Sequence, residues 1–134
     1  DFFRPRDAKH EAARLVMRNN TIEGSLCAAA FVGIDGGEFS DNTILFPTKW
    51  VFRILQENTS AGFAPCRDVK IQNNRIVFRR SQVQIEVNIG GNTEPESFKF
   101  DGNTWFAEDR PAASKPRLPV VETNGVYGED PRRK

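Results

Sequence analysis

The sequence predicts one small, mainly β domain, an antiparallel barrel or sandwich of about six or seven short strands with one helix in front. Two observations favour this fold class: apolar and polar residues alternate along residues 83–89, and turn residues recur at short intervals. A chain of 134 residues has the size of a single domain and can bury a core without disulfide or metal support. We place that domain at residues 1–109.

The first expected element is an amphipathic helix over residues 5–19. Pro5 suits the first turn of a helix, and apolar residues follow it at spacings of three and four: Ala8, Ala12, Leu15 and Val16. After the break at Asn19-Asn20, Ser25–Ile34 is apolar at nearly every position, which is typical of a strand buried on both faces.

The middle of the chain predicts extended segments that are separated by turns. Asp35-Gly36-Gly37 is a turn, and Thr43–Phe46 and Trp50–Leu55 form two strands interrupted at Pro47. In residues 69–78, apolar residues flank Asn73-Asn74, a pair that tolerates the positive φ angles of a tight hairpin. These strands are therefore expected to pair in antiparallel fashion.

The last expected strands are also indicated by alternating residues and by turn residues. Residues 83–89 show the alternation of a half-buried strand, which ends at Gly90-Gly91-Asn92. Residues 98–106 indicate another hairpin, which turns at Asp101-Gly102. No internal repeat of fixed period is visible, so the sequence does not predict a solenoid.

One local resemblance points in the same direction. The segment AAAFVGI, residues 28–34, followed by TILFPTKWV, residues 43–51, is loosely similar to the start of the chymotrypsin-like viral cysteine protease barrels. Lys49 stands where those proteins have their catalytic histidine, and no second barrel follows. The resemblance therefore implies a small β-barrel, and the chain is assigned to no family.

The end of the chain has a different composition. Residues 110–134 contain four prolines and many charges, without a periodic apolar pattern. We expect this tail to be disordered, or ordered only by a partner. Within it, Pro116-Arg117-Leu118-Pro119 is a PxxP segment of the kind that binds aromatic grooves as a polyproline helix.

The sequence offers little for catalysis, so we predict that the protein is not an enzyme. Its single histidine, His10, lies among charged residues, and no serine or cysteine stands in a recognisable nucleophile turn. Cys27 and Cys66 are expected to be free, structural thiols, although Arg67 beside Cys66 would favour a thiolate if that loop is exposed. No spacing of ligands predicts a metal site, and no motif predicts a cofactor.

Charge is unevenly distributed along the chain. Residues 49–80 hold seven basic side chains against two acidic ones, whereas residues 81–109 hold one lysine against six acids. If the basic residues share a face, they form a binding surface for an acidic partner. These candidate binding residues are Lys49, Arg53, Arg67, Lys70, Arg75, Arg79 and Arg80.

These features lead to a functional hypothesis with one alternative. We expect a non-enzymatic protein-interaction or assembly module that uses the basic strand region and flexible termini, through a protein partner or self-association. The alternative is single-stranded RNA or DNA binding, in which aromatic residues near the basic ones stack with bases. No apolar run approaches the roughly 18 residues of a membrane helix and no signal peptide is visible, so we expect a soluble protein of the cytoplasm or nucleus.

Overall fold

The computed structural model describes residues 12–132, whose strands lie in three sheets. Sheet A contains β1 (Ala12–Arg18), β4 (Ile34–Ser40), β7 (Arg67–Gln72) and β10 (Lys99–Asp101). Sheet B contains β2 (Thr21–Glu23), β5 (Thr43–Leu45), β8 (Arg75–Phe78), β11 (Thr104–Ala107) and β12 (Val126–Tyr127). Sheet C contains β3 (Ala29–Val32), β6 (Phe52–Leu55) and β9 (Val87–Ile89). Two short 3-10 helices, η1 (Pro95–Ser97) and η2 (Pro111–Ala113), lie in the connections.

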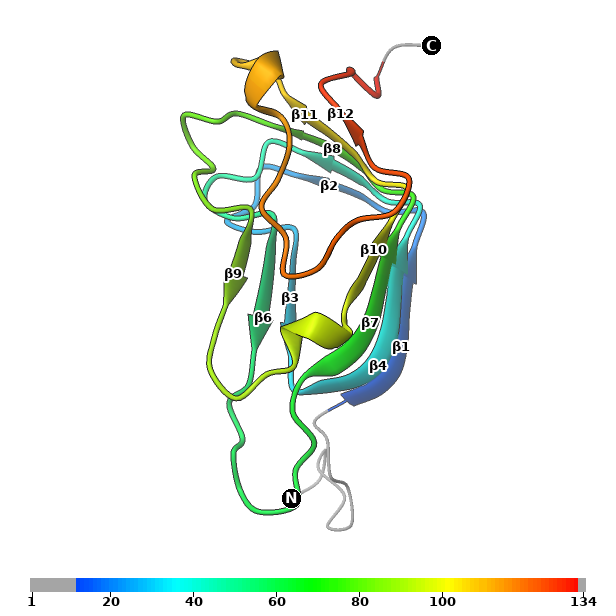
Figure 1. The fold of residues 1–134 in the computed structure, drawn as a ribbon, viewed down its shortest axis with the longest axis vertical. Helices are drawn as coiled ribbons and strands as arrows, with labels where there is room; N and C mark the ends of the chain where they lie inside the picture. The colour runs from blue at the N-terminus through cyan, green and yellow to red at the C-terminus, as the bar shows by residue number, and fades with distance from the viewer. Residues whose placement is uncertain (1–11, 133–134) are drawn as a thin grey trace.

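The chain winds through the sheets in the order A, B, C and then returns to A one layer further along. Every strand pair among residues 12–132 is parallel, so equivalent residues of successive coils stack, as Thr21, Thr43, Arg75 and Thr104 do in sheet B. Figure 1 shows the sheets as sides of one coil, with successive coils stacked in depth. The architecture is a parallel β-helix, a solenoid in which each coil packs mainly on its neighbours.

The expected antiparallel barrel or sandwich is therefore wrong. The expected hairpin turns at Asn73-Asn74 and Asp101-Gly102 do not close hairpins; at both places the chain turns from sheet A into sheet B within one coil. β7 pairs with β4 and β10, and β8 pairs with β5 and β11. The turn signal was misleading because a residue with positive φ, such as Asn73 at 56°, suits this corner as well as a hairpin.

The expected helix is also wrong where it is described, because residues 12–18 form β1, paired with β4. Leu15 and Met17 alternate with outward-facing residues and align with Gly37 and Phe39, so their spacing satisfies a strand. The rest of the expected helix and His10 lie outside the described residues. Pairing with a neighbouring coil decides the conformation here, and Leu15 and Met17, which are two residues apart, fall on the same face of the strand.

Aromatic side chains fill the interior of the coil. Phe31, Phe39 and Phe52 contact one another, and the Phe39 and Phe52 rings meet edge to face at 5.4 Å between centroids. Trp105 is fully buried and meets Phe52 at 6.2 Å. Because rings of this size bury large apolar areas, this stack supplies much of the hydrophobic stabilisation of the fold.

A ladder of asparagines fixes the corner between sheets A and B. The side chains of Asn42, Asn74 and Asn103 are buried, and each side-chain Oδ1 accepts the backbone N–H of the preceding asparagine in the ladder. Asn42 Oδ1 receives the N–H of Asn20 at 2.9 Å, and the other two distances are 2.9 and 3.0 Å. Since each buried amide is hydrogen-bonded on both sides, the ladder sets the register of the coils.

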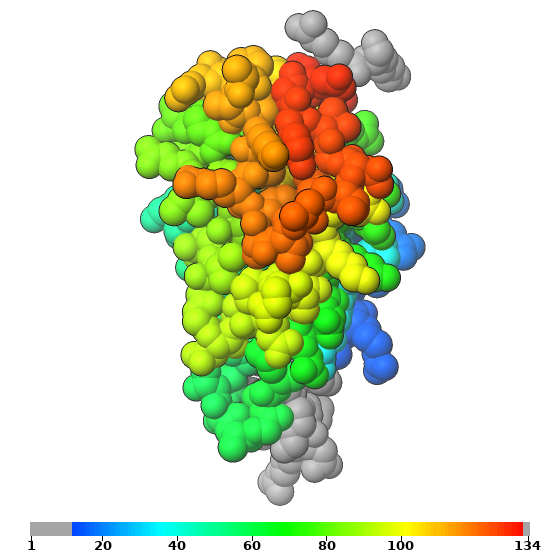
Figure 2. Space-filling view, viewed as in Figure 1, coloured from blue at the N-terminus to red at the C-terminus, as the bar shows by residue number. Residues whose placement is uncertain are grey.

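The C-terminal segment lies on the last coil. Glu122 ends the ladder: its carboxylate accepts bonds from the Asn103 Nδ2, the Trp105 Nε1 and the Tyr127 hydroxyl at 2.8, 3.1 and 2.9 Å. Figure 2 shows this orange-to-red segment spread over the front of the molecule. Composition predicts that the tail from residue 110 is disordered or ordered only by a partner. In the structure, Ser114 of this segment is buried and β12 pairs with β11.

Candidate binding surfaces

The seven predicted basic residues do not share one face. Lys49 and Arg53 lie beside sheet C, Arg67 and Lys70 on sheet A, Arg75 and Arg79 at sheet B, and Arg80 in the connection that follows β8. The coil separates them because consecutive strands belong to different sheets. In an antiparallel hairpin the same residues would have been neighbours on one sheet.

On the sheet C side, two of the predicted cations come together over one aromatic ring. The Lys49 ammonium lies 4.5 Å and the Arg53 guanidinium 4.3 Å from the centre of the Trp50 ring. Arg53 also donates a hydrogen bond to Asn88 Oδ1 at 3.0 Å. Both cations are held by the chain itself, and the ring that a nucleic-acid base would stack on is already occupied.

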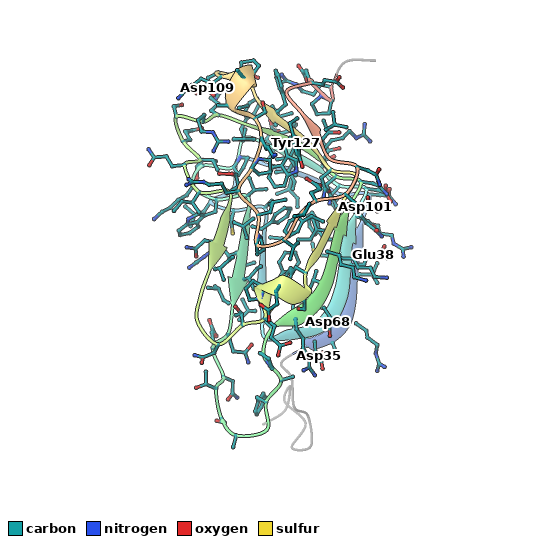
Figure 3. All side chains as sticks on the ribbon, in the orientation of Figure 1. Asp35, Glu38, Asp68, Asp101, Asp109 and Tyr127 are labelled. Atoms are coloured by element: carbon teal, nitrogen blue, oxygen red, sulfur yellow. The ribbon has the colours of Figure 1, made fainter. Side chains whose placement is uncertain are left out.

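On sheet A, the predicted cations face acidic neighbours. Arg67 pairs with Asp35 at 3.0 Å, and Lys70 stands next to Glu38 in the stacked strands. The pKa of Glu38 is held below its usual value, first by the hydrogen bond from Arg18 and next by that from Ser40. Figure 3 shows Glu38 and Asp68 along this sheet, away from Asp109 at the other end of the view. The acids offset much of the positive charge on this face.

On sheet B, Arg79 takes part in a surface cluster. Its guanidinium lies 4.4 Å from the centre of the Phe46 ring and 3.6 Å from a Glu108 carboxylate oxygen. Arg132 pairs with the same carboxylate at 3.0 Å and so joins the C-terminal segment to this cluster. Arg75 is exposed on the outside of β8. Arg79 therefore contributes to packing as well as to surface charge.

Arg80 lines an open cleft of about 730 Å³ between the 79–86 connection and the 109–117 segment. Its guanidinium donates to the carboxylate of Glu86 at 2.9 Å, and Glu86 is only 1% exposed. Asp109 at the cleft accepts the backbone N–H groups of Arg80 and Ser81 at 2.7 and 3.0 Å. Burial raises the pKa of Asp109, but these backbone hydrogen bonds outweigh it and lower the pKa overall.

Three further cations line this cleft: Arg110, Lys115 and Arg117. None is among the seven basic residues predicted to bind, although Arg117 belongs to the PxxP segment. All three belong to the segment that composition assigns to a disordered tail. Only the fold of the last coil brings them opposite Gln84 and Arg80. No local pattern in the sequence indicates that these residues lie close together.

A second surface lies at the N-terminal end of the coil. Leu15 and Met17 occupy inward-facing positions of β1 but are 47% and 42% exposed, because β1 is the outermost strand of sheet A among the described residues. They border an apolar cavity of about 250 Å³, together with Phe31, Ile34 and Val69. Leu26, in the first coil, is also exposed. The described residues therefore leave this end apolar and open.

The thiols are poor candidates for nucleophiles. Cys66 is fully buried, donates from Sγ to the Phe31 carbonyl at 3.3 Å, and burial raises its pKa. Burial also raises the pKa of Cys27, although nearby Arg53 acts in the opposite direction. Both thiols are free. Thiolate formation at Cys66 is therefore disfavoured. An exposed loop beside Arg67 would instead have favoured the thiolate.

Residues 12–132 offer neither a metal site nor a membrane-spanning helix. Those residues contain no cluster of three or more histidine, cysteine, aspartate or glutamate side chains suited to a metal ion. The same part of the chain has no helix that is long and apolar enough to cross a membrane.

Comparison with known proteins assigns no relative. No family model, no curated protein and no solved structure matches this chain.

Proposed function

We propose that this protein is an assembly module that binds a second copy of itself through the open N-terminal end of its β-helix. One observation carries the proposal: Leu15 and Met17 face inward in β1, yet these residues are 47% and 42% exposed. A solenoid needs a polar cap or a partner at such an end, because the end coil otherwise exposes the apolar interior.

The edges of the sheets support the same proposal. Among residues 12–132, β1, β2 and β3 are the outermost strands of sheets A, B and C, and no other described strand pairs with the outer row of backbone N–H and C=O groups of each. An unpaired edge beside an apolar surface is a template for further strand pairing. A partner that pairs with these strands would satisfy backbone hydrogen bonds and cover Leu15 and Met17 at the same time.

A second copy is the partner that fits this end best. Its N-terminal end has the same outline and the same apolar residues, so a two-fold contact covers both ends at once. The opposite end of the coil carries the 114–127 segment, whose Glu122 already ends the asparagine ladder. Contact between two N-terminal ends therefore gives a closed dimer rather than a filament.

Sedimentation equilibrium of the full chain tests the proposal. We expect a reversible dimer, and we expect Leu15→Glu combined with Met17→Glu to weaken dimerisation by at least about 100-fold, since carboxylates would be buried in the contact. Val121→Glu is the matched control, because Val121 is 92% exposed and belongs to the C-terminal segment. The control should dimerise like the wild type.

Two results would reject the assembly proposal. The first is a wild-type chain that stays monomeric at tens of micromolar, a concentration at which a dimer with a dissociation constant of about 1 μM would be largely formed. The second is a dimer that tolerates the Leu15 and Met17 changes, which would place its contact elsewhere. Circular dichroism of each variant separates loss of dimerisation from loss of folding.

A further inference from the structure

The cleft that Arg80 lines carries a surplus of positive charge, of which the fold uses part: Arg117 Nη2 donates to the Gln84 carbonyl at 3.2 Å, and the Lys115 ammonium lies 5.9 Å from the centre of the Tyr127 ring. Its two carboxylates are already engaged: Glu86 by the Arg80 guanidinium and the Arg117 backbone N–H, and Asp109 by two backbone N–H groups. Arg110, Lys115 and Arg117 form no ion pair with any described residue, whereas Arg80 does. Three cationic side chains therefore line one cleft without an acidic partner.

The cleft is held in place before any ligand arrives. The Arg80 guanidinium donates to the carbonyl of Ala113 at 2.8 Å and to that of Val83 at 3.1 Å, so it joins the two walls. The Arg117 backbone N–H donates to Glu86 Oε2 at 2.6 Å, which fixes the point from which the Arg117 side chain extends. Because the walls are already joined, little ordering remains to oppose binding.

The side chains of the cleft select the chemistry of its ligand. Arginine guanidinium groups bind oxyanions through paired N–H donors, and several cations in one cleft suit a ligand that carries several charges. No aromatic residue lines the cleft, so it offers no surface for base stacking. The cleft is open, and its volume of about 730 Å³ is large enough for a small molecule.

We propose that this cleft is a binding site for a small ligand with several phosphate groups, and that Arg110, Lys115 and Arg117 hold the phosphates. Arg80 and Glu86 act as positioning residues, because their hydrogen bonds join the two walls. The ligand is taken from the solution as an oligophosphate or a small phosphorylated molecule. The site lies in the segment that covers the last coil and does not depend on the proposed dimer.

Isothermal titration calorimetry with sodium tripolyphosphate tests the proposal. The test variant combines Arg110→Gln, Lys115→Gln and Arg117→Gln. The matched control combines Lys70→Gln, Arg75→Gln and Lys99→Gln, which removes three exposed positive charges from sheets A and B. We expect the cleft variant to bind at least about 10-fold more weakly than the wild type, and the control to change by less than about 2-fold, because only the first set touches the ligand.

Three outcomes would overturn the proposal. One is the absence of tripolyphosphate binding by the wild-type chain at low salt. Another is an equal loss of affinity in both variants, which would indicate attraction by overall charge alone. The third is tight binding of single-stranded RNA that depends on the cleft cations and that tripolyphosphate does not displace. Sedimentation of the cleft variant should show an unchanged oligomeric state, so this test is separate from that of the assembly proposal.

Discussion

Replacing Asn74 by alanine removes the centre of the asparagine ladder and should strongly destabilise the fold. The Asn74 Oδ1 accepts the backbone N–H of Asn42 at 2.9 Å, and its Nδ2 donates to the Phe39 carbonyl at 3.0 Å and to Asn103 Oδ1 at 2.9 Å. The site is 1% exposed. Each buried polar group left without a partner costs about 1–3 kcal/mol, so we expect a loss of roughly 3–5 kcal/mol.

Urea unfolding followed by tryptophan fluorescence measures this loss. Asn20→Ala is the matched control, since Asn20 is exposed and its side chain contributes one bond to the ladder, from Nδ2 to Asn42 Oδ1 at 3.1 Å. We expect the control to lose less than about 1 kcal/mol. A loss below 1 kcal/mol for Asn74→Ala, or equal losses in the two variants, would refute the idea that the buried ladder stabilises the coil.

Three other predictions follow from the described contacts. Burial, and next the hydrogen bond to Glu122, raise the pKa of Tyr127 to about 12. The contribution of Tyr127 to the free energy of unfolding should therefore be fully present below about pH 10, where tyrosine of an unfolded chain ionises, and should be lost as the pH rises through 12. Absorbance of the single tyrosine measures this pKa, and a native midpoint near 10 would contradict it. A thiol reagent should modify half-buried Cys27 in the native state and Cys66 only after unfolding; mass spectrometry identifies the labelled site, and native labelling of Cys66 would contradict its burial. Gly125→Ala should lower the melting temperature, because a Cβ there would lie 2.8 Å from Glu122 Oε1 and closer still to the Tyr127 hydroxyl; an unchanged melting temperature would show that this contact relaxes freely.

The sequence predicts a mainly β domain, and it places corners at Asn19-Asn20, Asn73-Asn74 and Asp101-Gly102. The turn expected at Asp35-Gly36-Gly37 is wrong, because these residues lie within β4, and the expected sheet arrangement is wrong as well. Turn chemistry at Asn73 or Asp101-Gly102 is local, whereas the choice between an antiparallel hairpin and a parallel coil depends on strands far apart in sequence. The decisive contacts, such as Phe39 with Ile71 across sheet A, join residues that no local pattern connects.

A repeat was nevertheless present in the sequence. Four segments share one motif, in which a polar or small residue is followed by an asparagine and, two positions after the asparagine, by an apolar residue. They are NNTI, DNTI, NNRI and GNTW, which begin at residues 19, 41, 73 and 102. In each, the first residue has positive φ and the asparagine is a member of the ladder. A search for one fixed period misses this motif because the connections between the sheets differ in length. A search for the motif itself would have predicted a solenoid.

The binding residues were harder to predict than the fold. Seven basic residues gathered in one part of the sequence spread over different faces once consecutive strands turn from sheet to sheet. The cleft instead combines Arg80 from that part with Arg110 and Arg117 from the segment that composition assigns to a tail. Linear charge counting fails in a solenoid because neighbours in space are one coil apart, not adjacent in sequence.

The two proposed sites lie at opposite ends of the stack of coils. Leu15 and Met17 belong to the first coil, whereas Arg110 and Arg117 follow the last strand of the fourth coil, β11. Each coil contacts mainly its neighbours, so any coupling must pass through the intervening ladder, which has one well-packed arrangement rather than two. Ligand in the cleft can shift dimerisation only if it binds monomer and dimer differently, and such an effect would be reciprocal. The geometry offers no route for that difference, so the dimer dissociation constant should be the same with and without saturating tripolyphosphate.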